Sequence, residues 1–359
     1  MHYSDTLAET IQRRYPDPDQ YPYCSWCYAQ GFMLWGFIRL YERTQNQKYY
    51  DYVLQYCEEH VKEDGEVLGF TGISLDDIMA GSVLVWAYTQ TKKEKYRLAC
   101  DRIRRAYDDY PRNPDGGFWH SRPRSGEMWV DGLFMGLMFL TRYGKYIGDS
   151  EFCFSETVKQ LSIVFDRCEK DGTGLLYHAY SANPDVLWAH PITGCSPEIW
   201  SEGLGWYAMI LVEVLELLPK DYPGCGRLLM QLTKLVDSLI KVQDPASGLW
   251  YQVVDKPHHR HNFHDTSGSA MFLYTIKKAL LLGLIEQKPE ILRAVKLGFA
   301  GIKTKYRIDP EGNVDIYDAC NGLCVQVDYD TYVEYARNVN CQEAVAAVLW
   351  ATGIMEYGI

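Results

Sequence analysis

Positive charge is scarce in this sequence. Its 359 residues contain 36 Lys and Arg against 47 Asp and Glu, which gives a formal net charge of −11. Nucleic acids and anionic membranes attract proteins through clustered Lys and Arg. We therefore expect no nucleic acid and no membrane as partners, and an anionic small substrate would need a local cation.

Long apolar runs are also missing. Apolar runs such as 279–282 are far too short to span a bilayer. Residues 1–6 have neither the basic start nor the apolar core of a signal peptide. We expect a cytoplasmic protein, and the sequence leaves open whether it is a monomer or a homodimer.

Several catalytic signatures are absent as well. There is no glycine-rich phosphate loop ahead of a helix, no convincing nucleophile elbow and no helical His-Glu-x-x-His, so hydride transfer, phosphoryl transfer and metalloprotease chemistry lose their main support. The eleven Cys are scattered and odd in number, which fits reduced thiols. Cys24 and Cys27 have redox-like spacing but no second pair, so a redox or metal role is not expected.

A histidine cluster near residue 260 does not change that expectation. It comprises His258, His259, His261 and His264. Its spacing matches neither two histidines one helical turn apart nor a zinc pattern. We expect no metal and no cofactor. A mobile loop that supplies positive charge to an acidic substrate, helped by Lys256 and Arg260, is the favoured interpretation.

What the sequence does have is an alternation of apolar and amphipathic segments. After a polar opening, apolar segments at 21–41, 78–88, 128–143, 204–218 and 267–284 are each followed by an amphipathic one, at 48–62, 95–107, 156–167, 228–241 and 290–306. Turns containing Gly65, Gly117, Gly174, Gly248 and Gly312 close these pairs, as in repeat architectures. A last helix over 342–357 could complete a sixth pair with the first helix.

This alternation predicts an all-α fold, an (α/α)6 toroid. Apolar helices shielded on both sides form the inner ring, and amphipathic helices form the outer one. No segment resembles a linker, so we expect residues 1–359 to be one domain. The 28 Tyr and 10 Trp suit a cleft that binds sugars, because these rings keep a polar edge. The pocket should lie where the inner helices begin.

Asp131 is the one charge in the apolar stretch 128–140. A carboxylate in such surroundings loses solvation, so its pKa should rise. A raised pKa turns a carboxyl group into a proton donor at neutral pH. The alternative is that Asp131 caps a helix beginning near Gly132 or pairs with an Arg.

Other polar and aromatic residues near the starts of inner helices are expected at the same mouth. They are Trp26, Tyr28, Asp76, Asp77, Trp129, Trp200, Glu202 and Trp206, joined by His120 and His178 at the ends of two turns. Carboxylates and histidine in an aromatic cleft are suited to proton transfer on a sugar. Each also has a structural interpretation: Asp76 or Asp77 as a helix cap, the histidines as hydrogen-bonded structural residues, and Trp206 as a core residue.

These motifs together resemble those of glycoside hydrolase family 105, the unsaturated rhamnogalacturonyl and glucuronyl hydrolases. The resemblance runs from about residue 26 to residue 284. It is carried by Gly-Phe-Trp-His at 117–120, Met-Trp-Val-Asp-Gly-Leu-Phe-Met at 128–135, Leu-Leu-Tyr-His at 175–178, Gly-Trp at 205–206, Gly-Leu-Trp-Tyr-Gln at 248–252 and Ser-Gly-Ser-Ala-Met-Phe at 267–272.

The resemblance implies a toroid and a metal-free hydration of a uronic acid that carries a C4=C5 double bond. The substrate would be an unsaturated oligosaccharide left by a polysaccharide lyase. By match to the family motif, Asp131 would protonate C4 and then take a proton from the water that attacks C5, with Asp76 assisting. His120, His178, Trp129 and Trp206 would line the sugar site.

The chain departs from the family pattern at two positions. Glu202 stands where many members have Arg in Trp-x-Arg before Gly-Trp, and Ser121 follows His120 where some relatives have Lys. Affinity for an acidic sugar should fall there unless another cation compensates. Arg122, Arg124 and the loop 256–261 are the candidates.

Three other functions stay open. An inverting glycosidase would use Asp131 and Glu202 as acid and base. A sugar epimerase would move a proton with His120 and His178. A non-catalytic toroid would only bind sugars. Activity on saturated glycosides would indicate the glycosidase. Entry of solvent deuterium into an uncleaved sugar would indicate the epimerase, and binding without turnover would indicate the binding toroid.

Overall fold

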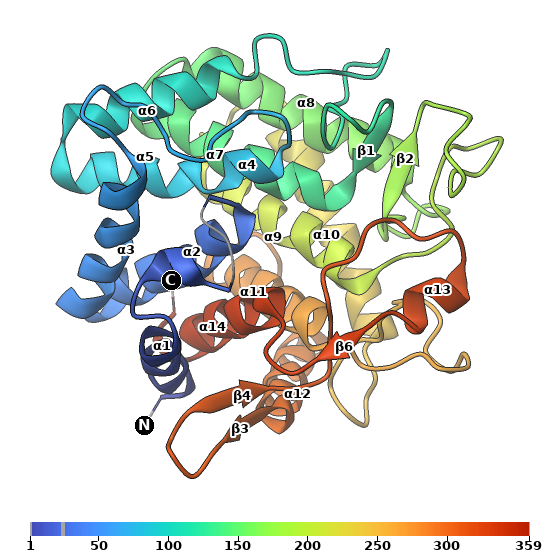
Figure 1. Cartoon of the computed structure of the whole chain (residues 1–359). Helices are drawn as coiled ribbons and strands as arrows, with labels where there is room; N and C mark the ends of the chain where they lie inside the picture. Colours follow the sequence, from blue (N-terminus) through green and yellow to red (C-terminus); the bar gives the residue numbers. More distant parts are fainter. Residues whose placement is uncertain (1, 23–25, 359) are drawn as a thin grey trace.

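The computed structural model describes residues 2–22 and 26–358, and within them six pairs of helices form a closed double ring (Figure 1). The inner ring is made of α2 (Tyr28–Thr44), α4 (Asp76–Met79) with α5 (Gly81–Thr91), α7 (Val130–Tyr146), α9 (Ser201–Leu217), α11 (Thr266–Leu281) and α14 (Gln342–Tyr357). Each inner helix packs on the next, and α14 packs on α2. The all-α toroid predicted from the sequence is confirmed.

The outer ring consists of five helices that each follow an inner one and of the first helix of the chain. They are α3 (Gln47–His60), α6 (Glu94–Arg105), α8 (Ser150–Cys168), α10 (Cys225–Val242), α12 (Pro289–Lys305) and α1 (Tyr3–Arg14). The inner helix α9 is buried without a break from Ser201 to Val214, whereas α10 buries only one face. This contrast is the physical basis of the apolar and amphipathic alternation.

The ring closes differently from the sequence prediction. The polar opening is the helix α1, and α14 pairs with it while packing on α2 as a neighbour in the inner ring. Glu356 of α14 accepts hydrogen bonds from the backbone N–H groups of Tyr3, at 2.7 Å, and Ser4, at 3.0 Å. The first inner helix begins at Tyr28 rather than at residue 21.

Short ribbons connect the pairs. The strand β1 (Glu127–Trp129) pairs with β2 (Ala179–Ser181), so α7 begins at Val130 and not at residue 128 as expected. Two further strand pairs join β3 (Tyr306–Ile308) to β4 (Val314–Ile316) and β5 (Ala319–Cys320) to β6 (Arg337–Asn338). A 3-10 turn, Pro18–Gln20, and the short helix α13 (Tyr329–Val333) complete the described elements.

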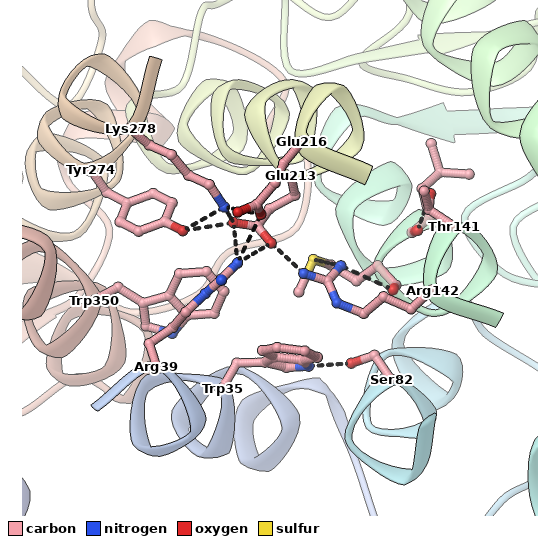
Figure 2. A network of polar contacts seen from close by, with 12 residues as sticks. Trp35, Arg39, Ser82, Thr141, Arg142, Glu213, Glu216, Tyr274, Lys278 and Trp350 are labelled. Carbon is pink, nitrogen blue, oxygen red and sulfur yellow. Dashed lines mark hydrogen bonds and ion pairs between the residues drawn. The ribbon is translucent and has the colours of Figure 1, made fainter. Parts of the chain in front are cut away.

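A buried ion network fills the bore at the end where the inner helices finish (Figure 2). Glu213 of α9 is completely buried and contacts Arg142 of α7, Lys278 of α11 and the Tyr274 hydroxyl, which donates to it at 2.6 Å. Arg39 of α2 donates to the same carboxylate at 2.8 Å. Four inner helices are thereby tied together at this end.

Within the described part of the chain, we find no helix with the length and apolarity needed to cross a membrane.

Candidate active site

A cavity of about 330 Å³ opens at the other end of the ring, where the inner helices begin, as the sequence predicted. Its lining includes Tyr28, Asp76, His120, Arg124, Trp129, Asp131, Trp200, Glu202, Trp206, Gly322 and Cys324. Most of the predicted site residues are therefore brought together, from helices and ribbons far apart in the sequence. Trp26 and His178 are not among the lining residues.

Asp131 occupies the first turn of α7. The residue that precedes the helix is Trp129, so Asp131 is not its N-cap. The ribbon β1 sets this start, because the pairing of Trp129 with Ala179 holds the chain extended up to the residue before the helix. The Asp131 side chain is 13% exposed and forms part of the lining of the cavity.

Two imidazoles flank the Asp131 carboxylate. Nε2 of His178 lies 3.5 Å from Oδ1, and Nδ1 of His120 lies 3.8 Å from Oδ2. Asp131 Oδ1 and these two ring nitrogens are buried and make no hydrogen bond to the described residues. The two rings thus face the carboxylate, His120 from the lining of the cavity and His178 from behind it.

The pKa of Asp131 corrects our expectation from the sequence. Burial raises it, but the neighbouring imidazoles of His178 and His120 outweigh burial and leave the pKa below its ordinary value. Burial lowers the pKa of His178, so this ring is neutral at pH 7. Burial also opposes the charge on His120, yet Asp76 and Asp131 raise its pKa above the usual range.

Asp76 reaches the same histidine from the opposite side. Its Oδ2 lies 3.4 Å from Nε2 of His120, so this ring bridges two carboxylates. Asp76 is the first residue of α4 and not its cap, which is Leu75. His120 stacks on Trp129 with ring centroids 4.1 Å apart, which fixes the plane of the imidazole. The neighbouring Asp77 instead contacts the Thr71 hydroxyl.

The aromatic candidates divide between the cavity and the core. Trp129, Trp200, Trp206 and Tyr28 line the cavity, although Trp206 is only 1% exposed. Trp26 lies in the core, where its indole N–H donates to the carbonyl of Asp77 at 2.7 Å.

Glu202 belongs to a group of buried carboxylates at the base of the cavity. It accepts a hydrogen bond of 2.7 Å from Ser267, and the same hydroxyl also lies 2.8 Å from Asp265. Burial, followed by the charges of Glu343 and Asp265, raises the pKa of Glu202 well above its ordinary value. Glu202 therefore keeps its proton to a higher pH than an ordinary Glu, and it lines the cavity.

Arg124 is the only Lys or Arg among the cavity-lining residues that the structure describes. Its guanidinium stacks over Trp129 at 4.3 Å and donates to the sulfur of Cys324 at 3.3 Å. Arg122, in contrast, pairs with Asp109 at 2.9 Å. In the loop, Lys256 pairs with Glu198 at 2.6 Å, and Arg260 lies 3.4 Å from Asp330.

His259 and His264 of the histidine loop contact different residues. Among the described residues, no group of three His, Cys, Asp or Glu has the geometry to hold a metal ion. His264 lies 2.9 Å from Asp244, and His259 packs against Tyr329. Cys24 lies outside the described residues.

Sequence reasoning missed Tyr332, Asp265 and Glu343. The Tyr332 hydroxyl lies 2.9 Å from Nδ1 of His178 and holds that ring, but no motif links two residues 154 positions apart. Asp265 could have been found as a helix cap, because Asp-Thr-Ser-Gly begins α11 and its carboxylate accepts from the Gly268 N–H.

Comparison with known proteins identifies the family. The model of glycosyl hydrolase family 88 matches residues 3–357. The chain belongs to this family. Membership of family 88 makes it a hydrolase that acts on sugars.

Individual relatives agree with this placement. A family 105 glycoside hydrolase of C. acetobutylicum ATCC 824 superposes with a TM-score of 0.92 and 29% identity over 98% of this chain and 99% of that one. This likeness confirms the resemblance to family 105 seen in the motifs. Protein Atu3128 of Agrobacterium fabrum is 35% identical over 50% of this chain and 76% of its own length. Unsaturated rhamnogalacturonyl hydrolase YesR of Bacillus subtilis is 23% identical over 65% of each chain.

Proposed function

We propose that this family 88 protein removes a terminal 4,5-unsaturated uronic acid from lyase-generated oligosaccharides by hydrating the C4=C5 double bond. The observation that carries the proposal is the Asp131 carboxylate between the imidazoles of His120 and His178 in an aromatic cavity. The likeness to a family 105 structure and the activity in the name of YesR support it.

The reaction needs one group that first gives and then takes a proton. Asp131 delivers a proton to C4 and then, as carboxylate, accepts one from the water whose oxygen bonds to C5. The product at C5 is a hemiketal, which opens to a ketone and leaves a hemiacetal at C1. Breakdown of that hemiacetal to an aldehyde expels the neighbouring sugar with its oxygen.

The proton for C4 comes from the pair of Asp131 and His120. In the free enzyme it resides on His120, whose pKa is raised, while Asp131 is ionised. A uronate entering the cavity adds negative charge beside Asp131, which raises the pKa of its carboxyl group. Substrate binding thus moves the shared proton toward the acid that uses it.

Arg124 is the group we assign to the substrate carboxylate. Glu127 lies 3.9 Å from its guanidinium, and its hydrogen bond goes to a sulfur, which is a weak acceptor that a carboxylate displaces. In this assignment Arg124, from the turn before β1, takes the place of the Arg that many family members have at the position of Glu202.

The test follows the ultraviolet absorbance of the conjugated enol ether. Lyase-digested disaccharides are incubated with wild type and with Asp131→Asn. Loss of absorbance with wild type alone supports hydration and the role of Asp131. No change on any unsaturated uronide would reject the proposal and direct attention to saturated glycosides.

A further inference from the structure

A second cavity of about 470 Å³ adjoins the first. Both are lined by Tyr28 and Gly322, so these two residues form the junction between them. A side chain at position 322 would meet Glu343 Oε1 at 2.9 Å and the Tyr28 hydroxyl at 3.4 Å. The glycine therefore keeps the backbone close to these groups without a side chain in the junction.

The lining of the second cavity is aromatic and amide-rich. It includes Tyr15, Tyr335, Asn321, Asn338, Asn340 and Gln342. Glu343 is the only Asp, Glu, Lys or Arg among its described lining residues, and it already accepts hydrogen bonds from Tyr28 and Gln342. The cavity thus offers hydrogen bonds and ring surface but no cation.

Several of these groups are available to a ligand. Asn338 donates to Asn321 Oδ1 at 3.0 Å, which leaves Asn321 Nδ2 and Asn338 Oδ1 without a partner in the part of the chain described. The Tyr335 ring is 36% exposed, and its hydroxyl makes no hydrogen bond to the described residues. An exposed ring beside unpaired amide groups matches the apolar face and the hydroxyls of a sugar.

We propose that this second cavity binds the sugar next to the scissile bond, and that this sugar is neutral. The inference rests on the proposed function and adds the class of leaving group. A sulfated or acidic sugar would bring a charge that loses solvation in a cavity with no lining cation to pair with it, which disfavours it. A neutral sugar uses the amides and the Tyr335 ring without that cost.

The experiment compares three substrates with the same unsaturated uronic acid. One carries a neutral sugar, one a sulfated sugar and one only a methyl group at C1. Wild type should show kcat/KM roughly tenfold higher for the neutral disaccharide than for the methyl glycoside, and no gain for the sulfated one. Tyr335→Ala and Asn321→Ala should reduce this preference and leave the methyl glycoside unaffected. Tyr146→Ala, at a tyrosine 49% exposed outside both cavities, is the matched control.

The outcomes separate the two proposals. Turnover of the methyl glycoside tests hydration alone, without the second cavity. If no substrate is turned over, calorimetry measures how the same variants bind the saturated neutral disaccharide and the saturated methyl glycoside. This comparison tests whether the second cavity binds a neutral sugar, independently of hydration. An unchanged preference in Tyr335→Ala and Asn321→Ala, or a wild-type preference for the sulfated disaccharide, would overturn the inference.

Discussion

Nε2 of His178 lies 3.5 Å from Oδ1 of Asp131, and the His178 side chain is completely buried. Because Tyr332 holds the other ring nitrogen, the imidazole cannot turn away from the carboxylate without losing that hydrogen bond. The His178 ring therefore keeps a fixed orientation beside the Asp131 carboxylate. Such preorganisation is what a proton-transfer group requires.

Replacing Asp131 by Asn should remove the hydration activity. The amide keeps the shape of the side chain but can neither give nor take the proton, so kcat/KM should fall by about 10²- to 10⁴-fold. The rate of absorbance loss measures the effect, and an unchanged thermal unfolding midpoint shows that the fold is intact. Near wild-type activity in this variant would remove Asp131 from the mechanism.

The pH profile should report His120. Its pKa is raised, so its proton is retained above the usual value of 6.5 and is lost as the pH rises through the raised value. We expect kcat/KM to fall on this alkaline side. Measuring kcat/KM from about pH 5 to about pH 9 for wild type and His120→Asn tests this. An alkaline limb that persists unshifted in the variant would assign it to another group.

Glu202→Gln distinguishes hydration from inverting glycosidic cleavage. Because burial favours the neutral form of Glu202, an amide of the same shape should change kcat/KM on an unsaturated uronide by less than about threefold. A glycosidase that used Glu202 as its base would lose about 10²- to 10⁴-fold on saturated glycosides. Assays of both substrate classes with both proteins decide between the two functions.

Arg124→Met should weaken binding of the uronate. Loss of a hydrogen bond to a charged group costs about 1.5–3 kcal/mol, so KM should rise roughly 10- to 150-fold with little change in kcat. The methyl ester of the same substrate carries no such charge and should be affected much less. Arg122→Met, whose guanidinium pairs with Asp109, serves as the control. Equal losses on acid and ester would argue against the assignment.

Glu213→Gln should destabilise the fold. It leaves Arg39, Arg142 and Lys278 without their shared carboxylate, and breaking a buried pair in this way costs about 3–5 kcal/mol. The pKa of Glu213 lies well below its ordinary value because the three cations outweigh burial. Its stabilisation is therefore fully present above pH 4.5 and is lost as the pH falls through the lowered pKa.

Urea unfolding near neutral pH measures this loss. Glu42→Gln removes a carboxylate that is 39% exposed and 3.8 Å from the same Arg39, and should cost at most about 1 kcal/mol. Similar losses of unfolding free energy in both variants would show that the buried network stabilises the ring no more than the exposed ion pair of Glu42 with Arg39.

Much of the architecture could be predicted from the sequence because it depends on local periodicity. Helices shielded on two sides are apolar all round, and that pattern is visible in single segments such as 204–218. Asp131, His120 and His178 could be grouped because they occupy related places in successive repeats. The polar helix α1 escaped notice because its buried positions include Ser4, Thr6 and Thr10, which do not produce an apolar stripe.

The rest depended on contacts between distant residues. The pKa of Asp131 was predicted in the wrong direction because burial is visible in the sequence, whereas the two imidazoles beside the carboxylate are not. Trp26 was placed at the mouth because it precedes an inner helix, yet its indole packs inward on Tyr56. Selecting Arg124 from the candidate cations required knowing that it lines the cavity, whereas Arg122, Lys256 and Arg260 pair with carboxylates outside it.

The ion network around Glu213 also bears on how products depart. Because side chains fill the bore at that end, both products of the proposed reaction share one exit. The two cavities adjoin at that end, so the uronate and the neutral sugar leave through the same mouth. The ring-opened keto acid and the released sugar should therefore each compete with fresh substrate for the free enzyme.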